Sequence, residues 1–336
     1  MSLLRSETGT HSATIEAIYH RTMRLSIQSF GPHCHRALQQ GALGRVAAVF
    51  ERSIYLEFPE GFVCIGPAVM GDGPLNAIVA QYDISDWRKY GLYPDKRVQV
   101  ANAAAWIEGR IQFSFCGVRI WTPPLRHADW PCTDLQTGLE TLERATCSRL
   151  PTQGLARLAL GSPSVQPDTP LSRRAQPPIE ALRRWLNSVL MTRTNTATDT
   201  DLNQAIGLLG MGPGLTPSGD DILGGTLIAL HVLGFDDIRE CLARTMLREI
   251  RRLTTPISAA HLRAAAEGMG NAAVHALLHA VLGPDTLTIK AAVDRISKLG
   301  HTSGWDTLAG VVIVLRSLMN PLNFAPSFVQ ERRPWC

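Results

Sequence analysis

One stretch in the second half of this chain places turn residues, hydroxyls and carboxylates directly ahead of an apolar run. It reads Gly210-Met-Gly-Pro-Gly-Leu-Thr-Pro-Ser-Gly-Asp-Asp-Ile-Leu-Gly-Gly225, and the residues that follow it, up to Leu233, are mostly apolar. The glycines and prolines before Ser218 oppose regular structure, whereas the residues after it are typical of the first turns of a buried helix. The stretch therefore predicts a loop that leads into a helix N-terminus.

The same pattern recurs in Gly300-His-Thr-Ser-Gly-Trp-Asp-Thr-Leu-Ala-Gly310. When Ser218 is aligned with Ser303, both copies read Ser-Gly-x-Asp-x-Leu-x-Gly, and an apolar helix follows each copy. The repeat predicts two equivalent loop-to-helix units. We expect the two helices to contact each other near Gly225 and Gly310, because paired glycines permit a close approach, and so to bring both loops to one site.

The polar residues of these loops permit two interpretations. In the first, Ser218-x-x-Asp221 and Ser303-x-x-Asp306 are capping boxes that satisfy the backbone amides of the helix starts. Capping does not explain Gly219 and Gly304 at the first helical position, where glycine costs up to about 1 kcal/mol relative to alanine. In the second interpretation, the free amides and positive dipole ends of both helices bind a small anion.

The second interpretation defines the residues that we expect at the site. The candidate catalytic residues are Asp221, Asp306 and His301. The residues expected to bind substrate are Gly214, Thr216, Ser218, Gly219, Asp220, Thr302, Ser303 and Gly304. The carboxylates suit three roles, namely holding Mg²⁺, accepting amide hydrogens or acting as bases, and His301 suits proton transfer. The residue types do not choose among these roles, so no metal site is assigned and the cofactor stays unknown.

The period of the apolar residues divides the chain into a β-rich half and a helical half. Runs typical of strands are 45–50, 53–58, 62–65, 77–80, 97–100, 111–115 and 118–121, and a short helix is expected before them at 13–28. Runs typical of helices are 179–191, 201–209, 220–233, 236–253, 257–267, 272–282, 287–299 and 306–319. A Pro- and Ser-rich stretch at 161–178 separates the two sets.

These patterns predict an α+β fold in which strands and helices are segregated along the chain. No helix of crossover length separates the strand-like runs, so we expect them to pair antiparallel. The expected domains are a β-rich antiparallel domain at 1–160, a linker at 161–178 and an α-helical domain with the paired loops at 179–325.

Composition excludes several classes of protein. Of the 336 residues, 45% are hydrophobic and 18% are charged, which is enough apolar material for a folded core and argues against disorder. The 33 basic and 29 acidic residues form no basic stripe, so nucleic acid is not an expected partner. The longest apolar runs contain glycine and are shorter than the ~20 residues that span a bilayer, and the first residues lack the apolar core of a signal peptide. We therefore expect a cytoplasmic protein with no membrane partner.

Three blocks of the second half resemble a known family. They are Gly212-Pro-Gly-Leu-Thr-Pro-Ser-Gly-Asp-Asp221, Thr255-Pro-Ile-Ser258, and Gly300-His-Thr-Ser-Gly-Trp-Asp306 followed by Leu308-Ala-Gly310. In this order they resemble the AllH-type family of oxamate carbamoyltransferase subunits, formerly a domain of unknown function, and residues 201–315 carry the resemblance. It implies a transferase of ureide nitrogen catabolism, in which oxalurate and phosphate exchange with oxamate and carbamoyl phosphate, within an assembly with partner subunits.

Two functions follow as hypotheses. The first is an enzyme or enzyme subunit that binds a small carboxylate or carbamoyl phosphate at the paired loops, with a nucleotide phosphate and Mg²⁺ at the same loops as a variant. The second is a non-catalytic scaffold or regulatory subunit, in which the loops are only capped helix ends. The carbamoyl substrates favour the first hypothesis, because they are anions that offer amide hydrogens to carboxylates.

Overall fold

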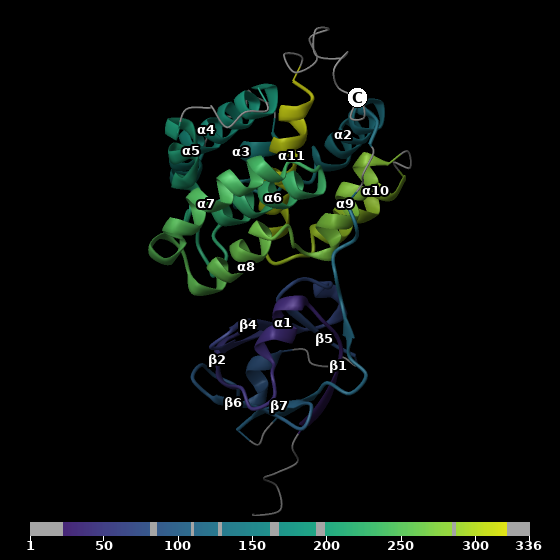
Figure 1. Ribbon diagram of the computed structural model, residues 1–336, viewed down its shortest axis with the longest axis vertical. Coiled ribbons are helices and arrows are strands. Elements are labelled where there is room, and N and C mark those ends of the chain that lie inside the picture. Colours follow the sequence, from purple (N-terminus) through teal and green to yellow (C-terminus); the bar gives the residue numbers. More distant parts are fainter. Residues whose placement is uncertain are drawn as a thin grey trace, which may run out of the picture.

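The computed structural model describes residues 23–80, 86–108, 111–126, 130–161, 168–192, 199–283 and 287–320. These residues form a sheet of strands followed along the chain by a body of helices, and Figure 1 shows the two parts one below the other. The predicted α+β organisation, with the β-rich part first, is confirmed.

The strands close into a barrel because β5 pairs with β1 as well as with β4. Along the sheet the order is β5, β4, β3, β2, β6, β7, β8, β1 and β9. The strands are β1 (Met23–Phe30), β2 (Leu43–Val49), β3 (Ile54–Phe58), β4 (Gly61–Gly66), β5 (Asn76–Val79), β6 (Arg97–Ala101), β7 (Ala104–Ile107), β8 (Ile111–Ser114) and β9 (Arg119–Ile120). The predicted strand-like runs thus lie on observed strands.

Side chains of β3 show how the barrel is filled. Ile54, Leu56 and Phe58 are buried in the barrel core, whereas Tyr55 and Glu57 alternate with them and lie on the outer face. This alternation is the period of two that predicted the strand. Tyr55 is thereby directed outward from the barrel.

Most strand pairs are antiparallel, as expected, but three pairs are parallel. They are β1 with β8, β1 with β9, and β4 with β5. Closure of the barrel explains the first two, because β1 must pair with strands that lie far along the chain and no hairpin determines their direction. The link between β4 and β5 crosses over through the 3₁₀ helix η2 (Ala68–Met70), which permits the parallel direction.

The helices form one body with a single large core. They are α2 (Cys132–Thr146), α3 (Ala156–Leu160), α4 (Pro170–Thr192), α5 (Asp199–Ala205), α6 (Ser218–Val232), α7 (Asp236–Leu253), α8 (Pro256–Ala266), α9 (Ala272–Leu282), α10 (Leu287–Ile296) and α11 (Ser303–Leu318), while α1 (Pro32–Ala37) lies on the barrel. Helices α6 and α11 are buried on nearly all sides, which explains their almost uninterrupted apolar sequences.

The expected linker at 161–178 is wrong at its C-terminal end, because α4 begins at Pro170 and continues through Pro177-Pro178. Residues 162–167 lie outside the described part. Proline fits the first turn of a helix, where the amides have no helical partner, but two interior prolines remove two helical hydrogen bonds. Packing offsets this loss, since the next residue, Ile179, is buried in the helical core.

The expected end of the β-rich domain at residue 160 is also wrong. Helices α2 and α3 share one core with α6 and α11, so the helical body begins near Cys132. The sequence did contain a pattern that indicates helix α2, because Leu135, Leu139 and Leu142 recur at helical spacing, and all three are buried. Near the start of the chain, 23–28 belong to β1 and not to the expected helix, whose first part, 13–22, lies outside the described residues.

The barrel contacts the helical body through α8 and the turn before α9. Leu75 and Phe62 of the barrel form a small apolar cluster with Ala260 and Ala264 of α8. The side chain of Asn271 donates to the carbonyl of Met70, and Ala272 N donates to Asp72 O at 2.8 Å. These contacts place the outer face of β3 and β4 against α8, which also packs on α6.

No helix in the described part of the chain is both long enough and apolar enough to cross a membrane.

Candidate functional site

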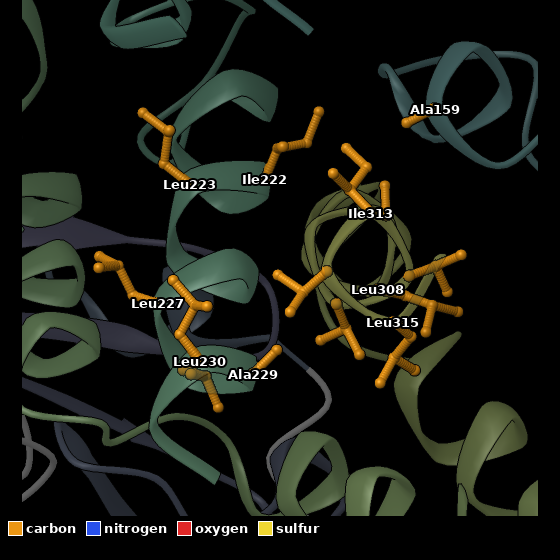
Figure 2. Close-up of a cluster of buried hydrophobic side chains, with 14 of the residues drawn as sticks. Ala159, Ile222, Leu223, Leu227, Ala229, Leu230, Leu308, Ile313 and Leu315 are labelled. Carbon is orange, nitrogen blue, oxygen red and sulfur yellow. The ribbon is translucent and has the colours of Figure 1, made fainter. Parts of the chain in front are cut away.

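Helices α6 and α11 cross at their glycines. A Cβ atom added to Gly225 would lie 2.0 Å from the carbonyl oxygen of Thr307, and one added to Gly310 would lie 2.0 Å from that of Ile222. In Figure 2, Ile222 points toward α11, whereas Leu223 points away from it. The predicted contact near Gly225 and Gly310 is confirmed, and its cause is the missing side chains that let backbone meet backbone.

This crossing brings the two loops together, and their polar side chains pair across it. Thr216 Oγ1 lies 2.9 Å from Ser303 Oγ. The Ser303 hydroxyl lies close enough to Asp221, and the Ser218 hydroxyl close enough to Asp306, to lower the pKa of each carboxyl. Each serine therefore lies beside the aspartate of the other loop, and residues 85 positions apart in the sequence form one polar cluster.

The capping-box interpretation does not describe these serines. Helix α6 has Pro217 as its N-cap and α11 has Thr302, and neither cap residue makes a side-chain capping hydrogen bond. Ser218 and Ser303 are the first helical residues, and their hydroxyls lie near the aspartates of the opposite loops. The polar side chains therefore connect the two loops to each other and do not cap each helix separately.

Asp221 and Asp306 each retain one buried oxygen without a partner. Asp306 is fully buried, and its Oδ1 accepts the amide of Leu155 at 2.7 Å. Asp221 is partly exposed, yet its Oδ2 is shielded from solvent. Neither Asp221 Oδ2 nor Asp306 Oδ2 has a hydrogen-bond partner among the described residues. Each of these oxygens can therefore accept a hydrogen bond from a water molecule or from a ligand.

Burial raises the pKa of both carboxyl groups, to different extents. For Asp221, burial and then the charge of Asp306 raise the pKa well above its ordinary value. For Asp306, burial raises the pKa, but the Leu155 amide and the Ser218 hydroxyl oppose the rise by binding the charged form. Asp221 is therefore the member of the pair that holds a proton more readily.

Asp220 does not face this cluster, contrary to the expectation that it binds substrate. Its Oδ1 accepts the amide of Gly210 at 2.7 Å, and its Oδ2 accepts the hydroxyls of Thr254 and, at 2.5 Å, Ser258. Both oxygens are occupied by the protein, and the side chain is buried. Asp220 thus ties the first loop to the start of α8, which explains the second carboxylate of the motif structurally.

Gly219 and Gly304 are needed for close backbone contact within the protein. Added Cβ atoms would lie 2.0 Å from Leu208 O and 2.0 Å from Ile296 O, respectively. The amide of Gly219 donates to Met211 O, and those of the next two residues donate to Pro217 O. These three amides of the first turn of α6 therefore donate to carbonyls of the protein itself. The expectation that they are free to bind an anion is wrong.

Two family models match the chain. One, described as oxamate carbamoyltransferase subunit AllH, matches residues 208–315, which contain both loops and both crossing helices. The other, described as the AllH family N-terminal domain, matches residues 23–120, which form the barrel. This chain belongs to the AllH family. The resemblance seen in 201–315 thus extends to the β-rich part, and the AllH description is that of an enzyme subunit. No solved structure matches the chain.

Two predicted site residues, His301 and Gly214, lie at the edge of the polar cluster formed by the two loops. His301 is exposed, and its Nε2 lies 2.7 Å from Gln153 Oε1. Gly214 is exposed, and its φ of +94° requires glycine, while an added Cβ would meet open space. Thr302 contacts Asp306 from the same loop and so belongs to the cluster itself.

Sequence reasoning missed the segment that covers Asp306. Gly154 has a φ of +79°, and an added Cβ would lie 2.7 Å from Asp306 Oδ2. Its neighbour Leu155 supplies the amide that binds Oδ1. The only available signal was a glycine in an otherwise ordinary turn about 150 residues away, and nothing in the sequence connects that turn to Asp306.

The barrel also reaches toward the cluster. The hydroxyl of Tyr55 lies 3.3 Å from His261 Nε2 on α8. Burial chiefly raises the pKa of Tyr55, and the charge of Asp221 makes a smaller contribution. The described residues contain no group of three His, Cys, Asp or Glu side chains arranged to hold a metal. The cluster therefore consists of two carboxyls and surrounding hydroxyls, close to the junction of barrel and helices.

Proposed function

We propose that this AllH-family chain is a subunit of a carbamoyltransferase whose paired loops bind a small substrate that carries both an amide and an anionic group. By resemblance, the reaction exchanges oxalurate and phosphate with oxamate and carbamoyl phosphate. One observation carries the proposal: Asp221 and Asp306 meet in one cluster, and each keeps a buried oxygen that no described residue satisfies.

The different pKa values of the two carboxyls suit an amide-bearing anion. Two charged carboxylates repel an anion, so one of them must hold a proton when the substrate binds. The raised pKa of Asp221 makes it the proton carrier, able to donate a hydrogen bond to a substrate oxygen. Asp306 keeps its charge more readily and accepts amide hydrogens at Oδ2. A carbamoyl group presents both an oxygen and an NH₂ group to such a pair.

The transfer needs one proton at the leaving nitrogen. An oxygen of phosphate attacks the carbamoyl carbon of oxalurate, the bond from that carbon to the oxamate nitrogen breaks, and the nitrogen gains a proton. We assign Asp221 as the donor of this proton and Asp306 as the group that orients the carbamoyl NH₂. His301, exposed on the loop of α11, is the candidate for returning the proton from solvent.

A non-catalytic role in an assembly is the second candidate. It is favoured by the donors that surround Asp220 and by the amides of α6 that bind the chain's own carbonyls, because both make the first loop a structural element. In that case the two free carboxyl oxygens would have no ligand, and substitutions there would leave substrate binding and turnover unchanged.

Calorimetry distinguishes the two candidates. Oxamate, carbamoyl phosphate and phosphate are titrated into the wild-type chain, alone and together with the other subunits of the enzyme. We expect Asp306→Asn to weaken carbamoyl phosphate binding by about ten-fold or more, because the charged acceptor of the carbamoyl NH₂ group is lost. Asp221→Ala should weaken binding by about three-fold or more, because the O–H donor to the substrate oxygen is lost.

Asp237→Asn serves as the matched control, since Asp237 is an exposed aspartate of the first turn of α7. Its affinity should equal that of the wild type. Equal affinities for all three variants, or no binding by the wild-type chain with its partner subunits present, would favour the non-catalytic role.

A further inference from the structure

A cavity opens in the helical body away from the paired loops. It has a volume of about 670 Å³ and lies among α2, α3, α4 and α11, at the end of the body that Figure 1 draws far from the barrel. Aliphatic side chains line it, among them Leu139, Leu158, Ile179 and Ile313. Its size is that of a site for a small organic molecule.

Two arginines line this cavity, and only one of them is fully engaged by the protein. Arg316 pairs with Glu143 and donates to the carbonyls of Ala159 and Leu160 at the end of α3. Arg183 donates through Nη2 alone, to Ala159 O at 2.7 Å. No carboxylate among the described residues forms an ion pair with Arg183. Burial and the nearby charge of Arg316 lower its pKa, and the charge of Glu180, one turn earlier on α4, opposes this change in part.

A second polar group stands beside Arg183. Asn187 follows it by four residues on α4, so the two side chains lie one above the other on the same helix face. Both line the cavity, and Asn187 Oδ1 is shielded from solvent with no hydrogen-bond partner among the described residues. The cavity thus contains the Arg183 guanidinium, which has further N–H donors to offer. One helical turn away lies Asn187 Oδ1, an acceptor that receives no hydrogen bond from the described residues.

We propose that this cavity binds a small amphipathic monocarboxylate that also carries an N–H or O–H donor. Its carboxylate binds Arg183, its donor binds Asn187 Oδ1, and its aliphatic part lies on the side chains of α2, α3 and α11. A single negative charge is specified because one guanidinium lacks a carboxylate partner, while Glu180, one turn earlier on α4, repels a second negative charge.

This site is separate from the paired loops. Arg316 and Asp306 are both on α11, ten residues apart, which corresponds to about 15 Å along the helix axis. Failure of the substrate site would therefore leave this proposal standing, and the converse also holds.

N-acetyl-leucine tests the proposal, because it combines a carboxylate, an amide N–H and an aliphatic side chain. Its affinity for the full chain is measured by calorimetry against N-acetyl-leucinamide, which lacks only the charge. We expect the carboxylate to bind about ten times more tightly than the amide. Arg183→Gln should remove that difference, and Asn187→Ala, which keeps the Arg183 contact with α3, should weaken binding by about three-fold or more.

Arg174→Gln is the matched control, since Arg174 is an exposed arginine of the same helix. It should bind N-acetyl-leucine as the wild type does, and so should Asp221→Asn at the paired loops. The proposal is overturned if the wild type binds neither probe, if both probes bind equally, or if Asn187→Ala has no effect. A loss of binding in Asp221→Asn would assign the probe to the paired loops and would also overturn it.

Discussion

At the scale of single residues, the character of the site depends on which carboxyls the protein satisfies. Three adjacent or equivalent aspartates have different surroundings: Asp220 is surrounded by donors, Asp306 keeps one amide, and Asp221 has mainly a serine hydroxyl and a nearby negative charge. The same side-chain type therefore joins two segments of the protein in one position and, in the reaction that we propose, carries a proton in another.

Asp221 should make the fold less stable at high pH. Its pKa is raised on folding, so its contribution to stability is greatest while the carboxyl is protonated and is lost as the pH rises through the folded pKa. We expect Asp221→Asn to raise the free energy of unfolding by about 1 kcal/mol at pH 8 and by less at pH 5. Urea unfolding at the two pH values measures this. An equal change in the free energy of unfolding at both pH values, or a destabilisation at pH 8, would contradict the raised pKa.

At the scale of elements, the crossing of α6 and α11 organises the helical body. The helices meet where Gly225 faces Thr307 and Gly310 faces Ile222, so their separation is set by backbone atoms. The loops that precede both helices are then held at a fixed distance, and the cross-paired serines and aspartates follow from that geometry. An apolar helix without glycine at this point would separate the two loops.

Gly225→Ala should therefore destabilise the fold by about 2 kcal/mol or more, because the new methyl group overlaps Thr307 O and forces the helices apart. The neighbouring Gly224 provides the control, since an added Cβ would make ordinary contacts at 3.9 Å with Leu262 and Ala265. Gly224→Ala should be neutral or stabilising by up to about 1 kcal/mol, as expected for a helix interior. Thermal unfolding of both variants decides, and equal losses would show that the crossing does not depend on Gly225.

At the scale of the whole molecule, the barrel and the helical body meet through groups that must stay uncharged. His261 of α8 lies against Tyr55 of the barrel, and burial, with a smaller contribution from His33, lowers the pKa of His261 to about 4. Because this folded pKa lies below the ordinary value of 6.5, the contribution of His261 to stability is complete above about pH 6.5 and is lost as the pH falls toward 4.

We accordingly expect the free energy of unfolding to decrease between pH 6.5 and 4, and His261→Gln to reduce that decrease by about 1 to 2 kcal/mol. His35→Gln, an exposed histidine on α1, should leave the pH dependence unchanged. Equal slopes for His261→Gln and the wild type would show that His261 does not titrate at this junction.

Much of the architecture could be predicted because local patterns report local structure. Strand-like runs located the strands of the barrel except β1 and β7, and the repeated motif indicated that Gly225 and Gly310 would meet. Helical spacing located the helices from α5 onward and the second half of α4, but α2 and α3 were not predicted. Where prediction was wrong, a distant contact opposed the local preference. Pro177-Pro178 disfavour a helix, yet buried neighbours hold them in one, and the strand pairs of β1 depend on barrel closure.

The sequence by itself determined that two equivalent loop-to-helix units exist, because the residues of each unit are contiguous and their spacing is visible. Only the tertiary structure decided which polar atoms remain free, since the partners of a carboxylate come from distant parts of the chain. Both oxygens of Asp220 accept hydrogen bonds, from Gly210 and from the start of α8, whereas Asp306 accepts one at Oδ1, from the amide of Leu155 next to Gly154. A hydrogen bond requires two groups in contact, and a linear pattern specifies only one of them.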